Sequence, residues 1–406
     1  MKKTINFALL LLLILVSGLA TRFFRDVSSL LIIFAVASFY LLCRERTLNM
    51  GYVASCAVWF CYAILSYVKY PGNNLFWPLL YFCNITIAYA VVRKYGESFI
   101  VFSTDVLFFL TVLSIVLFVF QLIALDPMLA IWQQFDLSEA LFDKPYTHYA
   151  HTFLYTIHQF KDTEKGAARN AGFCWEPGAF ACFLVIGVYF QLLRDGYKIG
   201  SNKIRYLTFL LAILTTQSTT GLVGLFVIVV WYLSSQPKGQ YAKYGFMAIL
   251  IASPLLALLP QQFEKIESQL SDDLLEQVLT LDENENEKGL GRFQSIIVLG
   301  VDFFDNPILG LGANKADSWV SRMGLDVNAT SGIGHMFATY GIFLMVPYLW
   351  LLYRSGKVYC QVFMCKGAWV FPVLMIVLGF SFSVLETPFF LTAAFYGAFN
   401  IKFRGI

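Results

Sequence analysis

The 406-residue chain is 58% hydrophobic and only 14% charged, whereas soluble domains average about 25% charged residues. Its formal net charge of +3 is too small to indicate a nucleic-acid partner. Apolar runs of about 17 to 25 residues, long enough to cross a bilayer, recur along the chain and argue against a soluble protein with one large core. The composition therefore predicts an all-α, polytopic membrane protein.

The first apolar run, 4–20, follows two lysines and ends in small residues, as a signal peptide does. Because further spans follow, an uncleaved signal anchor is favoured over a cleaved one. Hydropathy predicts about twelve transmembrane helices in all, and the other eleven lie at 28–43, 50–67, 74–92, 99–124, 178–194, 204–217, 219–234, 241–260, 334–353, 367–385 and 387–401.

The distribution of basic residues predicts the orientation of these spans. With the N-terminus in the cytoplasm, the cytoplasmic connections and termini are short and hold 17 Lys and Arg residues, against 12 in the much longer outer segments. The outer face then carries two long loops rich in Asp and Glu, 125–177 and 261–333. The sequence thus predicts a single membrane domain over 1–406, with both termini in the cytoplasm and one elaborated outer face.

The first long loop mixes aromatics with single charges and is expected to form short amphipathic helices on the outer leaflet. Its histidines, His148, His151 and His158, could share one helical face, but no carboxylate or cysteine pattern supports a metal site there. An aromatic interface is the favoured interpretation. The second loop opens with an amphipathic helix over 263–278, expected to pack over the protein's own outer cavity.

Several patterns argue against a channel or a pump. No internal repeat is visible, and charged residues deep inside the spans are almost absent apart from Asp105. The eight cysteines are scattered, so neither a disulfide framework nor a metal pair at Cys360 and Cys365 is expected.

Two candidate site residues lie where the first loop returns to the membrane, in "RNAGFCWEPGAF". Arg169 is either an arginine snorkelling at the interface or an anchor for phosphate, which a guanidinium binds in a bidentate fork. Glu176 precedes Pro177 at the start of a span, where it favours a helix N-terminus. In the functional interpretation Glu176 orients Arg169 or a sugar hydroxyl, or acts as a base.

Two more candidates lie further along the chain. Arg292 opens a helix-like run that ends before Pro307, and it either pairs with the acidic run before it or serves as a second phosphate ligand. His335 stands at the outer mouth of the span 334–353, as an interface residue or as a base, since histidine changes charge near neutral pH.

Five segments in the second half of the chain carry a family resemblance, and they occur in the order "RNAGFCWEPGAFACFL", "TQSTTGLVGLFVIVVWYL", "GRFQSI", "NPILGLG" and "SGIGHMFATYGIF". Through them the chain resembles the Wzy-type O-antigen and capsular polysaccharide polymerases, which are related to the O-antigen ligases. The resemblance covers about residues 165–350, and the N-terminal spans match only in hydropathy. Family members often have "SR" where this chain has Ser218–Thr219, and asparagine where it has Met336. These departures leave polymerase and ligase both open, although "EPG" at 176–178 favours a polymerase.

The resemblance implies a GT-C-like fold in the bacterial inner membrane and a substrate carried on undecaprenyl diphosphate. It implies that Arg169 and Arg292 bind the diphosphate and that His335 or Glu176 is the catalytic base. No cofactor is expected, and no nucleotide or paired-carboxylate metal motif is visible, so we expect a metal-independent glycosyltransferase. The expected partners are the lipid-linked donor and acceptor glycans, membrane lipid, a chain-length regulator and a flippase, with no nucleic acid. The alternatives are an O-antigen ligase and a lipid-linked oligosaccharide flippase, of which the flippase should have short loops on both faces.

Overall fold

The structure is a computed structural model that describes residues 2–20, 26–44, 48–71, 76–134, 149–151, 154–158, 168–235, 292–314, 316–324 and 331–400. Helices dominate this part of the chain. They are α1 (Lys2–Ser17), α3 (Val27–Arg44), α4 (Met50–Lys69), α5 (Phe76–Tyr95), α6 (Ser98–Ile123), α7 (Leu125–Gln134), α9 (Pro177–Arg194), η1 (Ile199–Asn202), α10 (Lys203–Thr216), α11 (Thr219–Ser234), α14 (Arg292–Asp305), α15 (Trp319–Arg322), α16 (Gly332–Val362), α17 (Val370–Ser381) and α18 (Pro388–Phe399).

Among the described residues, five helices are long and apolar enough to cross a membrane, namely α3, α4, α6, α9 and α16. Four shorter apolar helices, α1, α11, α17 and α18, coincide with further predicted spans, as do α5 and α10. The predicted span 241–260 lies outside the described residues, as does the predicted helix 263–278. The helical membrane protein is therefore supported, and the number of twelve spans stays a prediction.

Helix α9 lies at the centre of the molecule. Every residue from Pro177 to Leu193 is buried, and the helix is apolar on all sides, as an interior helix must be. It packs against α6, α10 and α11, while α18 packs against α5 and α16. The ring contacts of Phe183 with Phe389 and Phe390 join α9 to α18.

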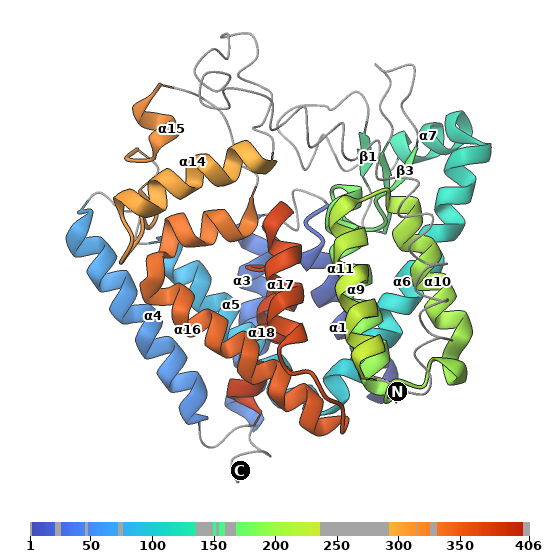
Figure 1. Cartoon of the computed structure of the whole chain (residues 1–406), viewed down its shortest axis with the longest axis horizontal. Coiled ribbons are helices and arrows are strands. Elements are labelled where there is room, and N and C mark those ends of the chain that lie inside the picture. The colour runs from blue at the N-terminus through green and yellow to red at the C-terminus, as the bar shows by residue number, and fades with distance from the viewer. Residues whose placement is uncertain are drawn as a thin grey trace.

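The two long loops contribute their described parts to the same end of the molecule. Figure 1 shows α7, β1, β3, α14 and α15 at the end opposite the start of α1 and the close of α18. We call this the loop end. The arrangement agrees with the prediction that both loops project to one side, and the side of a membrane that it faces stays a prediction.

A small sheet in the first loop corrects the all-α prediction. Strands β1 (Tyr149–His151), β2 (Thr156–His158) and β3 (Arg169–Asn170) pair antiparallel in the order β1-β2-β3. The loop does begin with the helix α7, but the expectation of further helices is wrong for the described residues 149–151, 154–158 and 168–170. Aromatic and β-branched residues favour a strand here, because Tyr155 and Ile157 are spaced by two and are both buried against α6 and α7.

The sheet is also fixed to α6 by hydrogen bonds. The Tyr155 hydroxyl donates to Gln121 Oε1 at 2.7 Å, and Gln121 Nε2 donates to the His158 carbonyl at 3.1 Å. His158 therefore lies on a buried strand, and His151 lies on the strand β1 beside it. His151 and His158 thus do not share a helical face, which their spacing had left possible, and His148 lies outside the described residues. The described part of the chain contains no cluster of three His, Cys, Asp or Glu side chains that could hold a metal ion.

The charge that the sequence places inside a span has a structural partner. Asp105 in α6 accepts through Oδ1 from Arg194 and from Arg205, both at 2.7 Å. Arg194 ends α9 and Arg205 lies in the first turn of α10, so the three helices are joined at the end opposite the loop end. A carboxylate between two guanidinium groups is a stable ion pair rather than a relay.

Helix α16 is broken near its outer end, and the break sets the direction of its first turns. Gly341 has φ 57° and ψ −169°, which no α-helix accommodates. The connection 306–312 inserts at this point, because the amides of Leu311 and Gly312 donate to the carbonyls of Ala338 and Thr339. In return, the amides of Ile342 and Phe343 donate to carbonyls in the same connection. The motifs "NPILGLG" and "SGIGHMFATYGIF" thus form one hydrogen-bonded unit, which holds the outer segment 332–340 at an angle to the rest of α16 (Figure 1).

A substitution at Gly310 tests whether this hydrogen-bonded unit stabilises the fold. It has φ 64°, and a Cβ atom there would lie 2.4 Å from the Thr339 carbonyl oxygen. Gly310→Ala should therefore lower the free energy of unfolding by about 2–4 kcal/mol, from left-handed strain and overpacking together. Thermal unfolding in detergent measures it. Gly300→Ala in α14, where a Cβ would meet nothing within 4 Å, is the control and should leave the Tm unchanged or raised. Equal Tm values for the two variants would contradict the role of the unit.

Candidate functional site

Two groups of polar side chains lie at the loop end, and the connection 382–387 between α17 and α18 contributes a residue to the contacts of each. The first group contains Glu176 and Arg292, and the second contains His335 and Glu386. The structure thus pairs two of the four residues that the sequence proposed for the site with each other, Glu176 and Arg292. It places a third, His335, beside a carboxylate that the sequence did not single out.

Glu176 pairs with Arg292. Glu176 is the N-cap residue of α9, with Pro177 as the first helical residue, but its side chain makes no capping hydrogen bond. Its Oε1 atom instead lies 3.5 Å from Arg292 and accepts from Trp175 Nε1 at 3.1 Å. The helix start predicted at this position is confirmed, while the carboxylate is directed toward the second loop. The prediction that Glu176 orients Arg169 is replaced by its pairing with Arg292.

Phe382 contacts Arg292 and the first turns of both α9 and α16. The Arg292 guanidinium lies over its ring at 4.5 Å, within the range of a cation–π contact. A Cβ at Gly178 would lie 2.0 Å from the same ring, and a Cβ at Gly332 would lie 2.2 Å from the Phe382 carbonyl oxygen. The small residues of "EPG" and "SGIG" therefore let the first turn of α9 approach the Phe382 ring and the first turn of α16 approach the Phe382 backbone, while Arg292 lies over the ring.

Arg169 is held at a different place on the loop end. Its Nε donates to the Thr216 carbonyl at 3.0 Å and its NH2 to the Gln217 carbonyl at 3.1 Å. These carbonyls close α10, where Gln217 has φ 49°, so Arg169 satisfies acceptors that a helix end leaves without intrahelical partners. The neighbouring Asn170 donates to Thr215 Oγ1 and joins the strand β3 to the same helix.

Arg169→Ala should for this reason lower both stability and function. Each hydrogen bond from a charged donor contributes up to about 1.5–3 kcal/mol to the free energy of unfolding. Loss of both should therefore lower the Tm by several degrees. Arg169→Lys should recover part of the Tm, because one ammonium group reaches one carbonyl. Thermal unfolding and membrane abundance measure this effect. An unchanged Tm in Arg169→Ala would show that the carbonyl contacts contribute nothing, and any loss of function would then belong to ligand binding.

The second group is a histidine, a carboxylate and a tyrosine. His335 Nδ1 lies 3.8 Å from Glu386 Oε2, and the Tyr340 hydroxyl donates to Glu386 Oε1 in a short hydrogen bond. The Nδ1 atom is buried and has no hydrogen-bond partner among the described residues, although the side chain as a whole is 44% exposed. The exposed surface of the imidazole therefore belongs to its other ring atoms.

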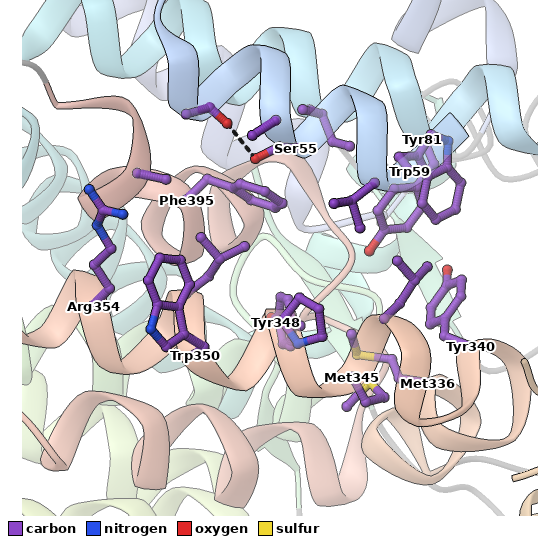
Figure 2. A pocket seen from close by; sticks show the side chains of 18 residues that line it. Ser55, Trp59, Tyr81, Met336, Tyr340, Met345, Tyr348, Trp350, Arg354 and Phe395 are labelled. Carbon is purple, nitrogen blue, oxygen red and sulfur yellow. Dashed lines mark hydrogen bonds between the residues drawn. The ribbon is translucent and has the colours of Figure 1, made fainter. Parts of the chain in front are cut away.

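An apolar cavity of about 220 Å³ begins beside this group and extends along α16 into the membrane-spanning part. Figure 2 shows Tyr340, Tyr81 and Trp59 at one end of it and Arg354 with Trp350 at the other. Tyr340 and Arg354 are fourteen residues apart on α16, which corresponds to about 20 Å of helix rise. The wall is almost entirely hydrophobic and is contributed by α4, α5, α16 and α18. A cavity of this shape and lining suits an extended hydrocarbon chain.

The Cys174 thiol, two residues before Glu176 in the chain, is buried. Burial raises the pKa of the Cys174 thiol well above its ordinary value, with smaller contributions from Cys182 and from the Glu176 carboxylate. All eight cysteines lie within the described residues and are free thiols. A thiolate nucleophile at the loop end is therefore disfavoured at Cys174.

The chain was compared with protein-family models, with curated proteins and with solved structures. It matches none of them. What the site does must therefore be argued from its own residues.

Glu386 and Phe382 are the residues that the sequence analysis missed. Both lie in a short connection between two apolar helices, where hydropathy gave no reason to single out a residue. A signal was present, because Glu386 stands two residues before Pro388, which opens α18, and Glu176 stands directly before Pro177, which opens α9. That pattern places a carboxylate at the positive end of a helix dipole on the loop end of the protein.

Proposed function

We propose that this protein polymerises undecaprenyl-diphosphate-linked oligosaccharide repeat units into an O-antigen, capsular or exopolysaccharide chain. The reaction is glycosyl transfer on the outer face of the bacterial inner membrane. The enzyme is a membrane glycosyltransferase that uses no metal ion.

One observation carries the proposal: a histidine–carboxylate group adjoins an apolar cavity at one end of a helical membrane protein, and a cation–carboxylate group lies at the same end. A lipid-linked glycan has an anionic diphosphate between an apolar chain and a sugar. The side chains Arg292 and His335 and the cavity beside Tyr340 offer a partner to each of these parts. The order of the sequence motifs supports the same substrate.

The chemistry follows from the leaving group. As the acceptor hydroxyl attacks the anomeric carbon of the donor, the bond from that carbon to the diphosphate oxygen breaks and negative charge develops on the diphosphate. Fixed guanidinium groups stabilise that charge, a role we assign to Arg292. Arg169, which the sequence also proposed for this role, lies apart from Arg292 and donates to the carbonyls that close α10. The hydroxyl must lose its proton, and His335 accepts it, with Glu176 as the other candidate base.

The pairing of Arg292 with Glu176 suits a site that must bind and release a diphosphate. At 3.5 Å and about one-third exposed on both sides, this ion pair is a weak one. An incoming diphosphate carries more charge than a single carboxylate, so it competes for the guanidinium. Glu176 then becomes free to accept a hydrogen bond from a sugar hydroxyl.

Deleting the gene in its source bacterium and analysing the surface glycan tests the proposal. A polymerase deletion leaves single repeats on the surface, and the wild-type gene restores the polymer. Loss of all surface glycan, with full-length polymer still on the lipid carrier, would assign the protein as a ligase instead. Absence of any outward-facing repeat would assign it as a flippase.

A further inference from the structure

Glu386 is placed as a fixed acceptor at the loop end. It lies in the connection 382–387, where the Thr387 amide and hydroxyl both bond to the Val384 carbonyl and close a turn. Val384 and Leu385 before Glu386, and Thr387 and Pro388 after it, are buried, so the turn is anchored in the core on both sides of its polar residue. The N-terminus of α18 follows directly and stabilises a negative charge on Glu386.

The two carboxylate oxygens of Glu386 have different neighbours. Oε1 accepts from the Tyr340 hydroxyl, and Oε2 faces His335 Nδ1. Tyr340 is itself held, because its ring contacts those of Trp59, Tyr62 and Tyr81 at centroid distances of 5.6 to 6.0 Å. A rigid donor on Oε1 fixes the rotation of the carboxylate and so the direction of Oε2.

The buried Nδ1 atom of His335 then determines which tautomer the ring adopts. A neutral imidazole has one N–H donor and one acceptor nitrogen. With a carboxylate oxygen as its facing group, Nδ1 gains by carrying the proton, and Nε2 keeps the lone pair. The separation of 3.8 Å exceeds a hydrogen bond by about 1 Å, a looseness common in sites without substrate that closes when the substrate binds.

We propose that Glu386 is a positioning residue that, pinned by Tyr340, holds His335 with its proton on Nδ1 and its basic Nε2 toward the acceptor hydroxyl. This inference rests on the proposed glycosyl transfer. The acceptor O–H proton passes to Nε2 as the new C–O bond forms, and the undecaprenyl diphosphate leaves with the electron pair of the broken bond. The proton on the imidazolium is then released to water, which restores the neutral ring.

The test reads the tautomer directly, with full-length protein labelled with ¹⁵N-histidine in lipid nanodiscs at a pH where imidazole is neutral. The chain has four histidines, and the signals of His335 are identified by their loss in His335→Gln. In the wild type we expect Nδ1 to be protonated. In Glu386→Gln the Tyr340 hydroxyl still donates to the side-chain amide oxygen, so the amide NH₂ group faces His335 Nδ1. Because that NH₂ group is a donor, Nδ1 should become the acceptor and the proton should move to Nε2. Glu97→Gln, at the start of α6, is the control and should leave the tautomer unchanged.

The activity arm uses purified protein and lipid-linked repeats. Glu386→Gln should lower kcat about 100-fold with little change in KM, and Glu386→Asp should recover part of it. A tautomer that is the same in wild type and Glu386→Gln would overturn the positioning role, as would a switched tautomer with wild-type kcat. If the tautomer switches in Glu386→Gln but the wild-type protein makes no polymer, the positioning role is supported and the proposed polymerase is overturned. Unchanged signals from the other three histidines show that the variant is folded.

Discussion

Replacing Arg292 with alanine should abolish polymer formation while the protein remains in the membrane at its wild-type level. The guanidinium lies over the Phe382 ring and 3.5 Å from Glu176, the N-cap residue of α9. If it binds the diphosphate, its loss removes a charge aimed at the leaving group, and such losses cost about 10²- to 10³-fold in kcat. Arg292→Lys should retain part of the activity, because a lysine keeps the charge without the bidentate fork.

The measurement is polymer length and amount in cells, followed by the rate with purified protein and lipid-linked repeats. Arg322→Ala is the matched control, since Arg322 belongs to the same long loop and pairs with the exposed Asp305. Loss of that surface ion pair is worth less than about 1 kcal/mol and should leave the polymer unchanged. Wild-type polymer in Arg292→Ala would exclude this arginine from diphosphate binding.

Replacing His335 with glutamine should lower kcat by about 10²- to 10⁴-fold without weakening donor binding, because a general base acts in the transition state. Glutamine keeps a polar side chain beside Glu386 but cannot accept the proton at neutral pH. The measurement separates kcat from KM for the acceptor with purified protein. His151→Gln, on strand β1, is the control and should polymerise at the wild-type rate.

Two outcomes would contradict this assignment. A wild-type rate in His335→Gln would exclude His335 as the base and favour Glu176, the other candidate. A rise in KM with unchanged kcat would mean that His335 binds a sugar rather than accepting a proton.

Much of the helical framework could be predicted from hydropathy, because a span must be apolar over its whole length. Helix α9 was predicted to begin at 178 and begins at Pro177, since proline and the preceding glutamate mark a helix start. The pattern could not foresee that α9 is the central helix, because an apolar helix surrounded by lipid and one surrounded by protein have the same composition. The sheet β1-β2-β3 was missed, since strands of two or three residues give too short an alternation to recognise.

The candidate site was predicted in part. Arg292, Glu176 and His335 are exceptional in the sequence, because they are polar residues beside long apolar runs on one predicted face. Their partners were not predictable, since the Glu176–Arg292 pair joins residues more than one hundred positions apart. Glu386 becomes visible only when α16 and α18 are placed side by side, which brings Tyr340 and His335 to the same carboxylate. A single sequence contains no information on such pairings beyond the sidedness of the loops.

The backbone hydrogen bonds between the connection 306–312 and the broken α16 have a consequence for the product. Helix α14 packs along the outer segment of α16, with Phe303 on Phe337 at a centroid distance of 5.5 Å, so Arg292 and His335 belong to one rigid block. In a polymerase, such a block would fix the distance between the diphosphate bound by Arg292 and the attacking oxygen beside His335. The regiochemistry of the glycosidic linkage would then depend on the close backbone contact between Gly310 and Thr339.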